Sequence, residues 1–204
     1  ELAMAEALMA LARGDAQAAS QATALARQKL PQKALPRLLA AQASILQGAP
    51  EAAAREYQKM IDADGSPQQK ILGLEGLFYG ARRRGDETAA AAYAAQVLQL
   101  APHAAWALDG LMAMAVRAQD WASAEDWLRR WARSGQKREL VRHRRSVVYM
   151  AQAQAELALD TQQGRDRALQ LANKAHAQQS DFLPAIGLRA RLHDYYGFVV
   201  AEHA

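Results

Sequence analysis

The sequence predicts an all-α protein, a right-handed superhelical array of helix–turn–helix repeats. A turn-forming Gly or polar residue recurs at Gly14, Gly48, Gly85 and Gln119, and the first two and the last two of these are each 34 residues apart. The segments between them are rich in alanine and poor in β-branched residues, which favours helix. Because each helix pair buries its apolar face against its neighbours, we expect a concave binding surface and no enclosed catalytic pocket.

This period is typical of the tetratricopeptide repeat (TPR). Pro31 and Pro102 each follow the Gly of their own repeat by 17 residues, where a helix pair should end. We therefore expect a single domain over residues 1–204 with about five and a half repeats. The expected repeats are 1–33, 34–68, 69–103, 104–136, 137–181 and a partial 182–204.

Helix-breaking residues set the expected helix bounds. The first four repeats should have helices near residues 1–12, 15–29, 34–47, 50–63, 69–84, 86–100, 104–118 and 120–134. In the fifth repeat no Gly or Pro interrupts residues 138–160, so we expect a long first helix there. A turn near Gly164 should lead to a second helix, and Gly197 should form a turn within the sixth repeat.

The repeat register predicts the core. Counted from Ile71, the third repeat has large apolar residues at positions four and seven and a small residue at position twenty, as TPRs do. The fourth repeat matches in the same way. We expect Leu74, Leu77, Leu108 and Leu111 to be buried, with Ala90 and Ala124 at the closest helix approaches. Trp127 and Trp131 share a helix face and are expected in the core between repeats.

The same register predicts a groove, because the first helix of each repeat lines the concave wall. The groove residues are expected to be Tyr79, Arg82, Arg83, Trp106, Asp109, Arg117, His143 and Arg144. The N-terminal part of the groove should be lined by Leu35, Leu38, Leu39 and Gln42. Aromatic and arginine side chains suit a protein or peptide partner with acidic and apolar residues. No Asn lies at these positions, which argues against a chaperone-tail carboxylate clamp.

The sequence lacks the motifs of an enzyme. It has no cysteine, no hydrolase or zinc-protease motif and no phosphate-binding glycine loop, so we expect neither catalysis nor a cofactor. The histidines are scattered, with no pair three or four residues apart, which argues against a metal or haem ligand set. A haem or porphyrin carrier is a third alternative. The sequence contains no run of 18 consecutive apolar residues, so it predicts no membrane-spanning helix.

Positive charge is concentrated in one segment. Residues 137–145 contain five basic residues and Glu139, a balance of +4 that equals the net charge of the whole chain. Binding of an anionic ligand there, either nucleic acid or lipid headgroups, is the alternative to a protein partner. Repeats that read nucleic acid need polar readers in every repeat, whereas the basic residues here cluster in three places. We therefore rank this alternative second.

Several stretches resemble the HemY family of bacterial inner-membrane TPR proteins associated with haem biosynthesis. The resemblance rests on residues 73–78, 81–86, 100–108 and 120–121 and on the run Arg142–Tyr149. It implies a protein-interaction scaffold linked to haem biosynthesis and attached to the inner membrane, with the repeats on the cytoplasmic side. In that family two membrane helices precede the repeats. This sequence contains neither helix and begins at Glu1 without Met, so we expect it to be a soluble fragment of a longer protein.

Overall fold

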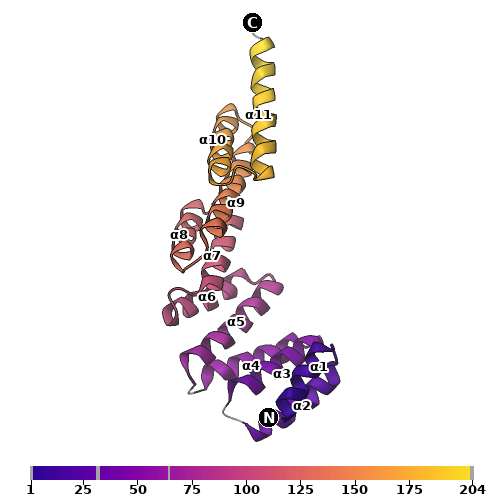
Figure 1. Cartoon of the computed structure of the whole chain (residues 1–204). Coiled ribbons are helices and arrows are strands. Elements are labelled where there is room, and N and C mark those ends of the chain that lie inside the picture. Colours follow the sequence, from indigo (N-terminus) through magenta and orange to yellow (C-terminus); the bar gives the residue numbers. More distant parts are fainter. Residues whose placement is uncertain (1, 31–32, 64, 203–204) are drawn as a thin grey trace. The chain divides into compact units, whose positions relative to one another are not determined.

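The computed structural model describes residues 2–30, 33–63 and 65–202, with side chains as far as Tyr196. In these residues it has eleven α-helices and no strand, which confirms the predicted all-α class (Figure 1). The chain divides into two compact units, unit 1 from Glu1 to Pro102 and unit 2 from His103 to Ala204. Each unit is described by itself.

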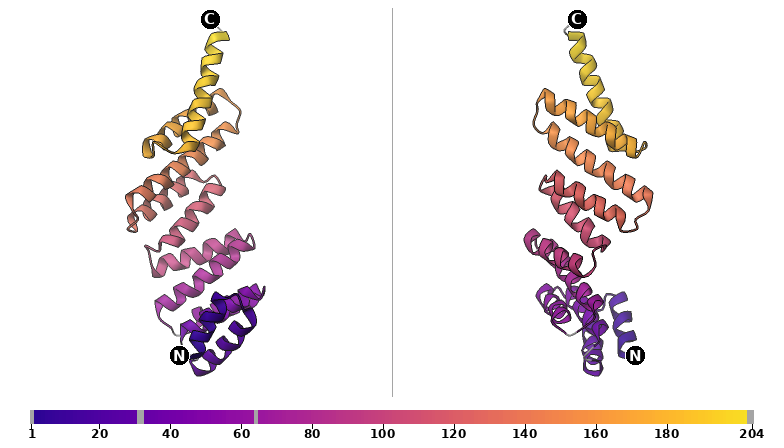
Figure 2. Two further views of the ribbon diagram at one scale, coloured as in Figure 1. Left: turned by 45° about the vertical axis from the view of Figure 1, so that its right-hand side comes forward. Right: turned by 90° about the vertical axis from the view of Figure 1, so that its left-hand side faces the viewer.

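Unit 1 is built from three helix pairs. The helices are α1 (Leu2–Ala12), α2 (Ala16–Lys29), α3 (Ala34–Leu46), α4 (Pro50–Asp62), α5 (Pro67–Arg83) and α6 (Glu87–Leu100). Each helix packs against the next one in the chain, and the two helices of a pair run antiparallel (Figure 2). This arrangement of successive antiparallel pairs is that of a TPR array.

The predicted turns within the first four repeats are present. Gly14, Gly48 and Gly85 have φ angles of 72°, 72° and 74°, a left-handed conformation that glycine adopts without strain. Gln119 occupies the equivalent place in unit 2 with a φ of 56°. After Gly14, Gly85 and Gln119 the next helix is capped by an aspartate: Asp120, for example, accepts a hydrogen bond from the Ser123 amide at 3.1 Å. After Gly48 the cap residue is Ala49, which has no side-chain hydrogen bond.

Unit 2 contains five helices. They are α7 (Ala105–Arg117), α8 (Trp121–Arg133), α9 (Arg138–Leu157), α10 (Gln162–Gln178) and α11 (Leu183–Glu202). Helices α7 and α8 form one pair and α9 and α10 another. With 20 residues, α9 is the longest first helix of any pair, as the sequence predicted, but it ends at Leu157, three residues before the predicted end at residue 160.

The predicted turn near Gly164 is misplaced. The chain turns at Ala158–Thr161, where Asp160 has a φ of 49°. Thr161 caps α10 by accepting a hydrogen bond from the Gly164 amide at 2.9 Å, so Gly164 lies in the first turn of the helix. A Cβ at Gly164 would be 2.4 Å from the Glu156 carbonyl oxygen. This glycine therefore permits a close approach to the end of α9 and does not break a helix.

The predicted turn at Gly197 is also wrong, because α11 continues through this position to Glu202. A single glycine lowers helix propensity by only about 1 kcal/mol, and no proline or capping residue reinforces it here. The sequence signal at Gly197 was thus weaker than at Gly14 or Gly85, where a capping aspartate follows directly.

The predicted core is confirmed for the leucines, the alanines and Trp131, and the prediction for Trp127 is wrong. Leu74, Leu77, Leu108 and Leu111 are each at most 8% exposed, and Ala90 and Ala124 are fully buried. The tryptophans divide: Trp131 is buried, whereas Trp127 is half-buried and carries the Arg130 guanidinium over its ring. Small residues at the helix contacts and large ones between them produce the close helix packing of both units.

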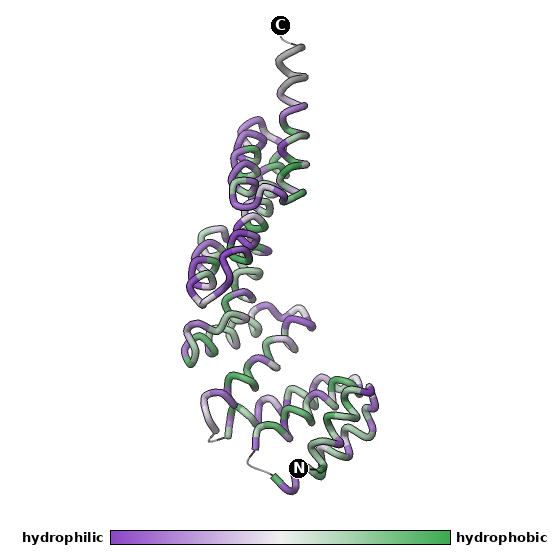
Figure 3. The backbone as a smooth tube through the Cα atoms, viewed as in Figure 1, coloured by the Kyte–Doolittle hydropathy of each residue, from purple (hydrophilic) through white to green (hydrophobic). Residues whose placement is uncertain are grey.

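Apolar and polar residues alternate along the helices (Figure 3). Within residues 2–30, 33–63 and 65–202, none of the helices combines the length and the apolarity that a membrane span requires.

Candidate functional site

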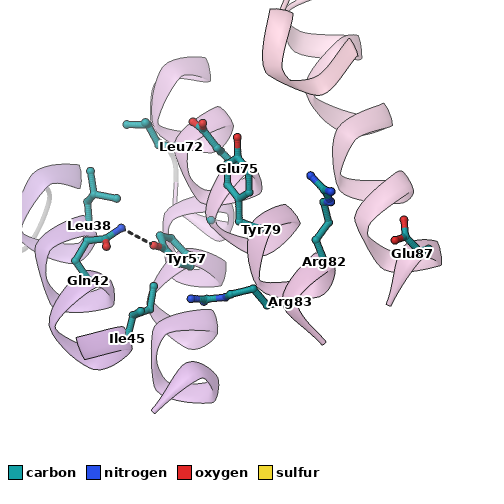
Figure 4. A pocket seen from close by; sticks show the side chains of 11 residues that line it. Leu38, Gln42, Ile45, Tyr57, Leu72, Glu75, Tyr79, Arg82, Arg83 and Glu87 are labelled. Carbon is teal, nitrogen blue, oxygen red and sulfur yellow. Dashed lines mark hydrogen bonds between the residues drawn. The ribbon is translucent and has the colours of Figure 1, made fainter. Parts of the chain in front are cut away.

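A pocket of about 570 Å³ opens in unit 1 between α3 and α5 (Figure 4). Helix α4 forms its floor and the first turn of α6 borders it. Its lining residues are Leu38, Gln42, Ile45, Tyr57, Leu72, Glu75, Gly76, Tyr79, Arg82, Arg83 and Glu87.

The helical repeat explains why these residues share a surface. On α3, Leu38, Gln42 and Ile45 are spaced i, i+4, i+7 and therefore follow one helix face. On α5 the lining residues begin at Leu72 and recur every three or four positions as far as Arg83. Two faces of this kind, on the first helices of successive repeats, form the pocket walls.

Tyr57 on α4 lies at the bottom of the pocket. It is 4% exposed, and its hydroxyl oxygen accepts a hydrogen bond from Gln42 Nε2 at 3.0 Å. The hydroxyl proton of Tyr57 has no acceptor among the described residues. The pocket floor therefore offers a hydrogen-bond donor to a ligand.

Two glycines let α4 and α5 approach closely at this point. A Cβ at Gly73 would lie 2.7 Å from the Tyr57 carbonyl oxygen, and a Cβ at Gly76 would lie 2.4 Å from the Tyr57 ring. Any side chain at position 76 would displace the ring that forms the pocket floor.

Charged groups of both signs surround the phenol. Burial raises the pKa of Tyr57, an effect that the positive charge of Arg83 opposes and the negative charge of Glu75 reinforces. Burial also raises the pKa of the Glu75 carboxyl group. Neither the Glu75 nor the Arg83 side chain forms a hydrogen bond or an ion pair within the part of the chain that the structure describes. Both charges thus remain available at the pocket surface.

The structure places three of the eight predicted groove residues in this pocket: Tyr79, Arg82 and Arg83. Tyr79 is 46% exposed, and the Arg82 guanidinium lies 5.7 Å from the centre of the Phe78 ring. Leu38 and Gln42 also line the pocket as expected. The prediction for Leu39 is wrong, because this residue is buried in the core.

The other five predicted groove residues lie in unit 2: Trp106, Asp109, Arg117, His143 and Arg144. Two of them form an ion pair, with Arg144 Nη2 at 2.8 Å from Asp109 Oδ1. The Arg144 guanidinium also lies 5.9 Å from the Trp131 ring centre. The Arg144 guanidinium therefore already interacts with two residues of unit 2, Asp109 and Trp131. That all eight residues form one groove across units 1 and 2 stays a prediction.

Part of the basic segment 137–145 has a structural role. Arg142 Nε donates a hydrogen bond to the Gln178 carbonyl oxygen at 2.7 Å, and His143 Nδ1 lies 2.9 Å from Gln179 Oε1. The His143 ring also contacts Phe182 edge-on, at 5.6 Å between ring centres. These contacts join α9 to the segment between α10 and α11, so only part of the segment is left for a ligand.

The sequence register missed six lining residues: Ile45, Tyr57, Leu72, Glu75, Gly76 and Glu87. Tyr57 was missed because it belongs to the second helix of its repeat, which was expected on the outer wall. A signal for it was present, since glycine within a helix often marks a close backbone approach. Gly73 and Gly76 are such a pair.

No group of three metal-binding side chains was found in the described part of the chain. The pocket supplies aliphatic walls, a tyrosine ring, a buried phenol, an amide and charges of both signs. Such a surface can hold an apolar side chain together with charged or hydrogen-bonding groups.

The helix pairs define the chain as a protein with the TPR fold. One solved structure with this fold is that of YrrB, described as a TPR protein with an unusual peptide-binding site. The two structures superpose with a TM-score of 0.57 at 14% sequence identity. The superposed region covers 90% of this chain and 88% of the YrrB chain. No protein-family model matches the chain, and no curated protein matches it.

Proposed function

We propose that this chain is a non-enzymatic scaffold that binds a segment of a partner protein in the α3–α5 pocket. The observation that carries the proposal is the pocket itself, whose walls come from the first helices of two successive repeats. Its floor is an intact hydrogen-bonded pair, Tyr57 and Gln42, so the site exists before a ligand arrives. The likeness to YrrB supports a peptide ligand for a fold of this kind.

The lining chemistry supports a proposal for the partner segment. Leu38, Ile45 and Leu72 provide an apolar wall for an aliphatic or aromatic side chain. Arg83 provides a guanidinium for an acidic side chain. The partner is therefore a peptide with acidic and apolar residues.

The wider setting of the scaffold rests on the resemblance of several short stretches between residues 73 and 149 to the HemY family. On that basis we propose a role at the bacterial inner membrane, in a complex associated with haem biosynthesis. The scaffold itself binds no cofactor and performs no chemistry. Crosslinking of the membrane-associated protein in cells, with capture of haem-biosynthesis proteins, tests this part.

Selection from a random dodecamer library displayed on phage tests the peptide-binding function. The parent chain should enrich a family of peptides that the Gln42→Trp variant does not retain. Gln42 is exposed, so the indole ring fills the pocket without disturbing the core. Equal enrichment by parent and variant, or no enrichment by either, would overturn the proposal.

A further inference from the structure

Two opposite charges flank the pocket floor on one helix. Glu75 and Arg83 both line the pocket from α5 and are eight positions apart. At 1.5 Å per residue, their backbones are about 12 Å apart along the helix. Figure 4 shows Glu75 at one end of the pocket near Leu72 and Tyr79, and Arg83 at the other end near Ile45.

The protein itself neutralises neither charge. Glu75 is half-buried and Arg83 is exposed, and neither side chain has an ion-pair or hydrogen-bond partner among the described residues. A carboxylate that is partly removed from water without a partner lowers stability. A ligand with a cationic group would supply the missing partner, which accounts for the Glu75 carboxylate in the pocket wall.

The other two charged residues of the pocket have different surroundings. Arg82 is turned away from Arg83 in Figure 4 and lies over the Phe78 ring at 5.7 Å. Glu87 belongs to the start of α6, at the border of the pocket. Glu75 and Arg83, in contrast, are both close enough to Tyr57 to act on its phenol, one from each end.

From this arrangement, and building on the proposed peptide-binding function, we infer that the pocket selects a bipolar segment. A cationic group of the ligand lies at Glu75 and a carboxylate lies at Arg83. The apolar side chain between them packs against Leu38, Ile45 and Leu72. An extended chain rises about 3.3 Å per residue, so the two ligand charges are separated by about three or four residues.

The pocket floor completes the site. The Tyr57 hydroxyl lies between the two charges and keeps a proton to donate. It therefore binds a backbone carbonyl oxygen of the segment, while Gln42 holds the phenol in place. Tyr57 fixes the depth of the segment, and the charges at the ends fix its register.

The dodecamers selected by the full chain in about 0.15 M salt test the charge pattern. Enriched sequences should contain Lys or Arg and Asp or Glu about three or four positions apart, with an apolar residue between. Two pocket variants should change the pattern reciprocally. The Glu75→Gln variant should lose the preference for the basic residue and keep that for the acidic residue. The Arg83→Gln variant should lose the preference for the acidic residue and keep that for the basic residue. Each should weaken the binding of a selected synthetic peptide by about 1.5- to fivefold, the range expected for one accessible ion pair.

Two charge-matched controls lie outside the pocket lining. Glu51→Gln on α4 and Arg84→Gln at the end of α5 remove the same charges and should leave the selection unchanged. Acetylating the N-terminus and amidating the C-terminus of the selected peptide distinguishes the source of the charges. Retained affinity assigns them to side chains, and lost affinity assigns one to a chain terminus.

The outcomes separate this inference from the function on which it rests. The bipolar site is overturned if the pocket-dependent peptides carry an acidic but no basic residue. It is also overturned if Glu75→Gln and Glu51→Gln change peptide affinity equally. Either result leaves peptide binding intact. The absence of any peptide that depends on the pocket, judged by the Gln42→Trp variant, overturns both.

Discussion

Gly76 of α5 faces the ring of Tyr57 of α4 so closely that a Cβ at position 76 would lie 2.4 Å from the ring carbons Cε1 and Cζ. This contact places a buried tyrosine, from the second helix of its repeat, at the bottom of a pocket between two first helices. A glycine in a helix interior, which lowers helix propensity, is thus what makes the pocket floor possible.

Replacing this glycine should destabilise the protein. Gly76→Ala should lower the free energy of unfolding by about 1–3 kcal/mol through overpacking, although alanine favours helix by about 1 kcal/mol. Gly80→Ala, one turn further along α5, is the matched control. Its Cβ meets only the Arg84 guanidinium, at 3.5 Å, so it should stabilise by about 0.5–1 kcal/mol. Urea unfolding measures both values, and a shift in the same direction for both would contradict the packing account.

Glu75 should make a pH-dependent contribution to stability. Burial raises the pKa of its carboxyl group in the folded state, so as pH rises the unfolded chain loses this proton first. Glu75 therefore lowers stability as pH rises from the ordinary glutamate pKa through the raised one. The Glu75→Gln variant should be more stable than the parent at pH 7, and this advantage should shrink at pH 4. Urea unfolding at the two pH values measures the difference, and an equal advantage at both would exclude burial as its cause.

The register in repeat four can be tested in the same way. Ala124 is fully buried, so Ala124→Leu should cost about 1–3 kcal/mol by overpacking. Ala122 lies on the same helix but is exposed, and Ala122→Leu should change stability by less than about 0.5 kcal/mol. Thermal unfolding of the two variants compares them directly, and similar melting temperatures would show that α8 is rotated from its described position.

The pair Arg144–Asp109 predicts a small coupling energy. The two side chains are 40% and 34% exposed, so water screens the 2.8 Å contact. A double-mutant cycle with Arg144→Gln and Asp109→Asn should give about 0.2–1 kcal/mol. A coupling indistinguishable from zero would show that the contact does not stabilise the fold.

The periodic part of the fold was predictable from the sequence. The helix bounds of the first four repeats and the buried positions Leu74, Leu77, Leu108 and Leu111 follow from the repeat spacing and from helical periodicity. These features are local or recur, so one sequence contains several copies of the same signal. The positions that failed, Gly164 and Gly197, occur after the period breaks, where a single glycine was interpreted without supporting residues.

The pocket was only partly predictable. Tyr79, Arg82 and Arg83 follow from the register of one helix, which sequence spacing describes well. Tyr57 does not, because its place depends on how closely α4 approaches α5. That distance is set by Gly73 and Gly76 through tertiary contact. The ion pair between Arg144 and Asp109 likewise depends on the packing of α7 and α9, which the separate helix registers do not specify.

The central claim is that a peptide occupies the α3–α5 pocket above Tyr57. The most direct measurement is isotope-filtered NMR of the full chain with a selected peptide, which detects contacts between peptide protons and the ring protons of Tyr57 and Tyr79. The account predicts such contacts to an apolar side chain of the peptide, and their loss in the Gln42→Trp variant. A bound peptide with no contact to either ring would contradict it.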